Sequence, residues 1–139
     1  MSTRSNIAVE HCNGTVSDIY CHSDGYISEV GTTLFKCWKS TSQLRSLVAL
    51  GDISSLGDHL GDTKAYHRDR GDEKSPARTH ATVHDYINKS EDIAYRRDWG
   101  YEYLYLFSRK SGWMVKEYDL PWRPLYLALV EEKLTDEED

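Results

Sequence analysis

Two stretches of the chain alternate between apolar and polar residues in the way that predicts β-hairpins. In the first, residues 5–11 and 16–22 are short strand-like segments separated by an Asn-Gly turn at 13–14, the strongest short-range hairpin signal. With the glycine in the left-handed position of a bulged turn, Ile7 faces Ile19 across the two strands. This register puts the apolar residues of both strands on one face.

The second predicted hairpin pairs residues 101–107 with residues 113–118 across a Ser-Gly loop at 111–112. Along the first of these strands, the tyrosines and Phe107 share one face and the leucines share the other. The leucine face is the natural core side. We therefore expect the tyrosines on the outer face or against a second layer.

Helical spacing of apolar residues predicts helices between and after the hairpins. These cover residues 28–39, 42–50, 90–97 and 125–134. Ser28 and Thr41 are candidate N-caps of the first two, and Gly51 ends the second. Residues 57–79 combine glycines with many charges and predict a long exposed connection, whereas residues 80–86 alternate loosely enough for a strand.

The whole pattern predicts one compact α+β domain over residues 1–130, with an antiparallel sheet built on the two hairpins and helices on one face. No apolar run is long enough to span a membrane, and no secretory signal begins the chain, so we expect an intracellular protein. Three cysteines without CxxC spacing are expected as free thiols, and no metal site is predicted.

Negative charge is concentrated at the C-terminus. Residues 131–139 hold six acidic residues and one basic residue, which accounts for five of the six net negative charges at pH 7. We expect a nearly neutral body followed by an acidic, disordered tail that aids solubility or contacts a partner. The chain lacks the basic surplus of an ordinary nucleic-acid-binding protein, so direct nucleic-acid binding is not expected.

Tyrosine and tryptophan gather toward the C-terminal end, where nine of the fourteen lie between residues 95 and 126. Two interpretations stay open. In the first, the tyrosines of the second hairpin pack across strands and under the last helix, with their hydroxyl groups exposed to water. In the second, they form a binding face, since tyrosine and tryptophan dominate contact energy at interfaces. The candidate contact residues are Trp99, Tyr101, Tyr103, Tyr105 and Trp113.

Residues 67–78 offer a second candidate site. The His67, Arg68, Arg70 and Arg78 side chains suit an anion or nucleotide, and the interleaved acids equally suit a solvated mixed-charge loop. The chain contains no Walker loop, HExxH or GxSxG motif, and no nucleophile is paired by sequence with a base. We expect neither an enzyme nor a cofactor.

Several motifs resemble a group of small proteins encoded by bacteriophages and prophages. They lie at residues 3–10 (TRSNIAVE), 13–16 (NGTV), 20–22 (YCH), 24–26 (DGY), 30–31 (VG), 50–57 (LGDISSLG), 65–71 (AYHRDRG) and 103–107 (YLYLF). The likeness covers most of the chain except the C-terminal tail. Ser23 and Ile27 depart from the group, which commonly has tryptophan and often proline there.

The resemblance implies a mobile-element accessory protein that works in the bacterial cytoplasm and acts stoichiometrically on host machinery. Anti-CRISPR inhibitors are the sharpest form of this hypothesis, with a CRISPR-Cas effector as partner. The contact surface would be the aromatic cluster, joined by the acids of the tail, which could compete for a basic groove on the target. These acids are Glu131, Glu132, Asp136, Glu137 and Glu138. The alternative is a nucleic-acid- or nucleotide-binding protein that uses residues 67–78.

Overall fold

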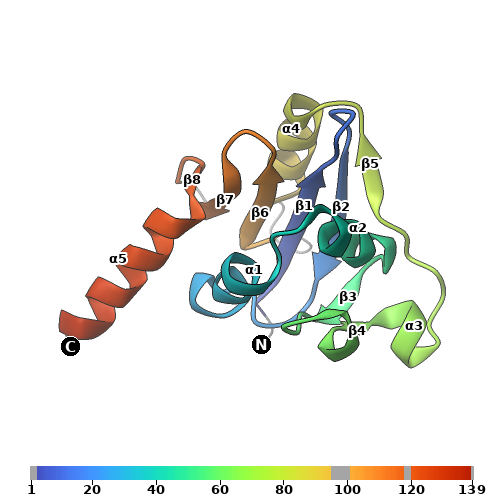
Figure 1. Ribbon diagram of the computed structural model, residues 1–139, viewed down its shortest axis with the longest axis horizontal. Coiled ribbons are helices and arrows are strands. Elements are labelled where there is room, and N and C mark those ends of the chain that lie inside the picture. The colour runs from blue at the N-terminus through green and yellow to red at the C-terminus, as the bar shows by residue number, and fades with distance from the viewer. Residues whose placement is uncertain (1–2, 95–100, 118–119, 139) are drawn as a thin grey trace.

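The computed structural model describes residues 3–94, 101–117 and 120–138, with the side chains of 91–94 and 134–138 left out. A mixed eight-stranded sheet forms its centre (Figure 1). The strands are β1 (Ser5–Glu10), β2 (Val16–Cys21), β3 (Ile53–Ser55), β4 (Lys64–Ala65), β5 (Arg78–His80), β6 (Tyr103–Ser108), β7 (Gly112–Glu117) and β8 (Arg123–Pro124). The helical elements are η1 (Ile27–Gly31), α1 (Thr32–Cys37), α2 (Thr41–Ala49), η2 (Leu60–Asp62), α3 (Tyr66–Arg70), α4 (Val83–Ala94) and α5 (Leu125–Glu138).

Both predicted hairpins are present. In the first, Ile7 lies opposite Ile19 and Gly14 has a φ of 87°, as the turn sequence predicts. In the second, β6 and β7 pair antiparallel from Tyr103 to Ser108. The α+β class is therefore confirmed.

The sheet is not purely antiparallel as predicted, because β1 and β6 pair in parallel and so do β2 and β3. The strand order is β4-β3-β2-β1-β6-β7-β8, and β5 pairs with the other end of β2. The two hairpins lie side by side through their first strands. Nothing in either hairpin specifies this contact, since it joins segments almost a hundred residues apart.

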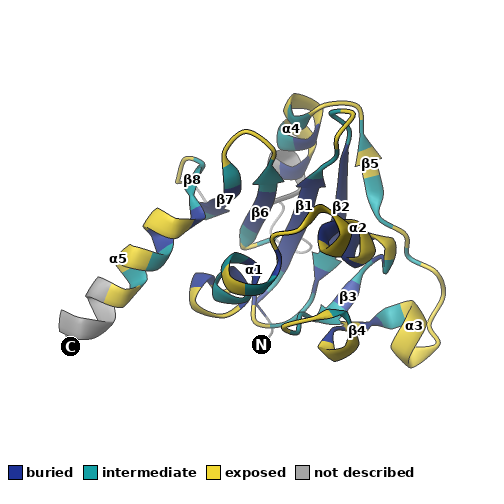
Figure 2. Cartoon of the chain, viewed as in Figure 1, coloured by how far each residue is buried: buried dark blue, intermediate teal, exposed yellow. Residues whose placement is uncertain are grey.

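Helices cover both faces of the sheet, not one. Residues of β1, β2, β6 and β7 on one face pack with α1, α2 and the first turns of α5 in the main core. On the other face, Ala8, Val16 and Leu106 pack with Tyr86 of α4 in a smaller cluster. Figure 2 shows dark blue, buried positions along β1 and β2 between these layers. Both faces of the leucine–tyrosine strand are therefore core faces.

Some predicted boundaries shift. The predicted helix at 28–39 is η1 followed by α1. Helix α2 is capped by Ser40, not Thr41, because Ser40 and Gln43 form a reciprocal capping box. The predicted strand at 80–86 is wrong: β5 ends at His80, and α4 begins at Val83.

The C-terminal acidic segment also differs from its prediction. Helix α5 continues through Glu138, so residues 131–138 are helical where the charge pattern predicts a disordered tail. In the described part of the chain, none of the helices has the length and apolar character that crossing a bilayer requires.

Candidate interaction surface

The predicted row of outward tyrosines does not exist as one surface. Tyr105 and Trp113 are buried in the main core. The Tyr105 hydroxyl donates to the Gly25 carbonyl oxygen at 2.7 Å, and the Trp113 indole nitrogen donates to the Trp38 carbonyl oxygen at 2.8 Å. Their polar tips are satisfied inside the protein, so they act as core residues. Trp99 lies outside the described residues.

Tyr101 and Tyr103 lie on different sides of the sheet. Strand β6 begins at Tyr103, so Tyr101 precedes the alternation and packs near Tyr20, with 5.9 Å between ring centroids. Tyr103 instead packs edge-to-face on Tyr26 at 6.2 Å. Burial, followed by the charges of Glu117 and Glu132, raises the pKa of Tyr103 to about 12. Its surroundings are thus acidic.

The cationic side chains of residues 67–78 are largely occupied within the molecule. Arg68 donates to the carbonyl oxygens of Leu60 and Thr63 at 3.0 and 2.6 Å and pairs with Asp69. The ring of His67 hydrogen-bonds the carbonyl oxygen of Asp72, and Arg70 lies 3.9 Å from the Asp72 carboxylate. These contacts fold the segment on itself and do not converge on an open site.

Arg78 has a role away from that loop. It joins the carboxylates of the buried Asp18 and the half-buried Asp52, each at 2.8 Å. Burial lowers the Arg78 pKa, but the hydrogen bonds to Asp52 and Asp18 outweigh this effect and hold the pKa above its usual value. Asp18 also accepts from Asn6 at 2.8 Å and contacts His80 at 2.6 Å. The network fastens β5 to β2.

Among the described residues, exposed large apolar side chains gather on α5, and Tyr26 and Leu120 are exposed elsewhere. Residues 125–130 are all apolar, and a continuous apolar run in a helix places apolar side chains on every side. Leu125 and Ala128 are buried against the body, whereas Tyr126, Leu127 and Val130 are 53%, 45% and 52% exposed. These three, the α5 stripe, point away from the buried side.

Figures 1 and 2 show α5 projecting from the body, with yellow, exposed positions along it. The helix contacts η1, α1, β7 and β8. The run at 125–130 was the sequence signal for the stripe. Helical spacing predicts the helix at 125–134, but it does not show which side of an all-apolar run the rest of the protein covers.

Acidic side chains flank the α5 stripe. Glu131 is exposed and pairs with Arg123, which also lies 3.6 Å from Glu117. Glu132 is half-buried on the side facing Tyr103. Asp136, Glu137 and Glu138 continue the same helix, and their side chains lie outside the described part. The sequence therefore adds negative charge toward the free end of α5.

No protein-family model, curated protein or solved structure matches this chain. In the part of the chain that the structure describes, no group of three or more histidine, cysteine and acidic side chains could hold a metal ion.

Proposed function

We propose that this chain is a bacteriophage or prophage anti-defence protein that binds a bacterial CRISPR-Cas effector in the cytoplasm and inhibits it stoichiometrically. Helix α5 is the docking element. The observation that carries this assignment is the α5 stripe, where Tyr126, Leu127 and Val130 are about half exposed on a helix that stands off the body. The phage resemblance of the motifs supports the origin of the protein.

A helix that presents an apolar stripe fits a groove on a partner, as many helix-mediated complexes do. Covering the exposed parts of these side chains contributes on the order of 1 kcal/mol each. That gain is too small for tight binding against the entropic cost of association. The partner must therefore supply further contacts to the neighbouring charges.

The charges of α5 indicate the chemistry of that partner. Glu131 is exposed beside the stripe, and the sequence adds three acids at 136–138. A groove with an apolar floor and a rim of lysine or arginine complements this helix. Nucleic-acid-binding channels of CRISPR effectors are basic because they hold a phosphate backbone. An acidic helix in such a channel would exclude the nucleic acid.

The test is inhibition of target cleavage by purified CRISPR effector complexes, titrated with this protein. We expect inhibition to saturate near equal concentrations of protein and effector. Leu127→Glu with Val130→Glu should raise the concentration needed by at least about tenfold, because charge replaces the apolar contact. The matched control is Ser46→Glu with Ala49→Glu, which adds the same charge on exposed positions of α2. Circular dichroism shows whether each variant is folded.

Other outcomes identify other classes. Inhibition by far less protein than effector would indicate an enzyme. Binding of labelled RNA or DNA without any effector that is lost when Arg70 and Arg78 are replaced by glutamine would favour the nucleic-acid alternative at residues 67–78. A dimer that dissociates in the α5 double variant would show that a second copy occupies the stripe. Full inhibition by that variant would remove α5 from the proposal.

A further inference from the structure

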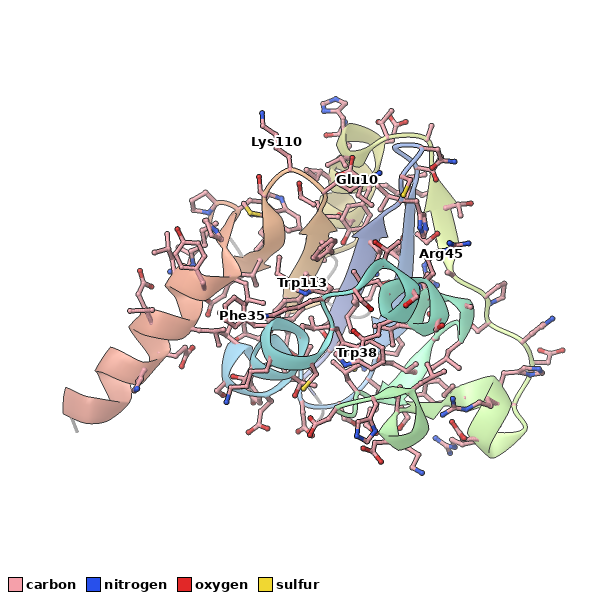
Figure 3. All side chains as sticks on the ribbon, in the orientation of Figure 1. Glu10, Phe35, Trp38, Arg45, Lys110 and Trp113 are labelled. Carbon is pink, nitrogen blue, oxygen red and sulfur yellow. The ribbon has the colours of Figure 1, made fainter. Side chains whose placement is uncertain are left out.

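A concavity of about 630 Å³ lies at the end of the sheet where three turns meet. The β1–β2 turn, the start of α2 and the β6–β7 turn form its walls. Its lining residues are Glu10, His11, Cys12, Asn13, Thr15, Thr41, Arg45, Phe107 and Arg109. In Figure 3, Glu10 lies at the end of β1, Lys110 at the β6–β7 turn and Arg45 on α2. This volume is in the range of small-molecule sites.

Two arginine side chains in this lining are free of partners among the described residues. Within the described residues, the guanidinium groups of Arg45 and Arg109 make no hydrogen bond or ion pair, and both residues are exposed. Glu10 accepts the backbone N–H of Arg109 at 2.9 Å. Arg68, Arg78 and Arg123, by contrast, are held by carboxylates. The concavity therefore holds two guanidinium groups that no carboxylate neutralises, although the body as a whole has a net charge close to zero.

Guanidinium groups bind phosphate through paired, charge-assisted hydrogen bonds. Lys110 follows Arg109 in the same turn and adds a third exposed cation. The side chains of Asn13, Thr15 and Thr41 add neutral polar groups. Glu10 is the acid of the lining, so positive charge is in excess there.

The concavity also has an aromatic wall. Phe107 is half-buried and is held edge-to-face on the buried Trp113, with ring centroids 5.4 Å apart. A ring fixed in this way offers a surface for stacking a nucleobase, an interaction that tolerates any base. Phosphate donors and a stacking ring in one concavity are the two features that recognise a nucleotide.

We propose that this concavity binds a nucleotide, with its phosphate on Arg45 and Arg109 and its base against Phe107. The nucleotide is either free or the end of a nucleic-acid strand, since both present the same chemistry. The site lies apart from the α5 stripe and does not depend on the anti-defence proposal.

The experiment measures binding of AMP and inorganic phosphate by calorimetry, and of a fluorescent thymidine oligonucleotide of about ten residues by anisotropy, at about 50 and 200 mM salt. Arg45→Gln with Arg109→Gln should weaken AMP and oligonucleotide binding at least about tenfold. The matched control, Arg70→Gln with Lys74→Gln, removes the same charge from exposed positions elsewhere and should change neither. Leu127→Glu with Val130→Glu should also bind AMP normally.

A further variant separates base from phosphate. Phe107→Leu should weaken AMP binding about tenfold and leave phosphate binding unchanged, because only the stacking surface is lost. Tighter binding of the oligonucleotide than of AMP identifies a strand end, and equal binding identifies a free nucleotide. Absence of AMP and oligonucleotide binding at millimolar concentration would overturn the proposal. An equal loss in the control variant would do the same, since it would show unspecific charge attraction.

Discussion

The indole N–H of Trp113 donates to the main-chain carbonyl oxygen of Trp38 at 2.8 Å, which joins strand β7 to the end of α1 inside the main core. The Trp38 indole in turn donates to the Gly57 carbonyl oxygen at 2.9 Å. Both rings are buried. Two tryptophans thus connect three segments that are distant in sequence, and each satisfies a backbone group that helices and strands leave unpaired.

Trp113→Phe tests this role. We expect a loss of about 2 to 4 kcal/mol in the free energy of unfolding, because the smaller ring leaves a cavity and the Trp38 carbonyl oxygen loses its donor. Urea unfolding followed by circular dichroism gives the value. Tyr126→Phe is the control on an exposed aromatic residue and should change stability by less than about 0.5 kcal/mol. A small effect at Trp113 would return it to the candidate contact surface.

Arg78→Ala should destabilise the protein more than most substitutions of partly exposed residues do. The Asp18 and Asp52 side chains that it joins are only 5% and 13% exposed, so the variant leaves two largely desolvated carboxylates without their cation. We expect a loss of about 2 to 4 kcal/mol, reduced from the fully buried case because part of Arg78 reaches solvent.

Arg70→Ala is the matched control for that change. Its 3.9 Å contact with Asp72 joins two exposed side chains, so the loss should stay below about 0.5 kcal/mol. If Arg78→Ala were equally mild and lowered an affinity for nucleotides instead, the binding role predicted for residues 67–78 would be restored. Unfolding curves and AMP titrations of both variants decide between these outcomes.

Alkaline pH should destabilise the folded state through buried weak acids. Burial raises the pKa of the Cys21 thiol from 9.0 to about 11 and that of Tyr20 from 10.0 to about 12. The pKa of Tyr105 is also held well above its usual value by burial. Above pH 9 the unfolded chain therefore releases protons that the folded chain keeps, and the free energy of unfolding falls as pH rises.

Urea unfolding between pH 8 and pH 11 measures this slope, and Cys21→Ala should make it shallower between pH 9 and pH 11. Reaction with a thiol reagent at pH 8 provides an independent check. The exposed Cys12 should react quickly and Cys21 only as the protein unfolds. Fast reaction of Cys21 in the folded protein would contradict the burial that raises its pKa.

The parts of the fold that sequence predicts well are those that short-range physics decides. The Asn-Gly turn determines the Ile7–Ile19 register, and alternation defines β6 and β7. The parallel contact between β1 and β6 depends on a packing choice across the whole chain, so no local signal predicts it. The prediction that helices cover only one face of the sheet is wrong for a similar reason. Helix α4 covers the second face, and its first residues belong to a segment whose alternation favours a strand.

The candidate site shows a related limit. Tyr105 and Tyr126 are the same residue type, yet one is buried and the other is 53% exposed. Composition alone cannot separate them. Tyr105 is packed in the main core, where the Gly25 carbonyl oxygen accepts its hydroxyl, whereas Tyr126 lies on the outer side of α5. In residues 67–78, likewise, the charge composition does not reveal that the Arg68 guanidinium donates its hydrogen bonds to backbone carbonyl oxygens.

Helix α5 provides the prediction that separates structure from function on a single element. Leu125→Ala should cost about 2 to 4 kcal/mol of stability, since Leu125 is buried in the main core and truncation leaves a cavity. Leu127→Ala and Val130→Ala should cost less than about 1 kcal/mol each, because half of each side chain already faces solvent. Thermal and urea unfolding of the three variants compare these costs.

If α5 is the docking element, the two outer variants should weaken inhibition of the effector while the protein stays folded, and the loss should grow when they are combined. A stability cost at Leu127 or Val130 as large as that at Leu125 would show that the α5 stripe is covered within the molecule. The stripe could then not contact a partner, and the docking role of α5 would be wrong.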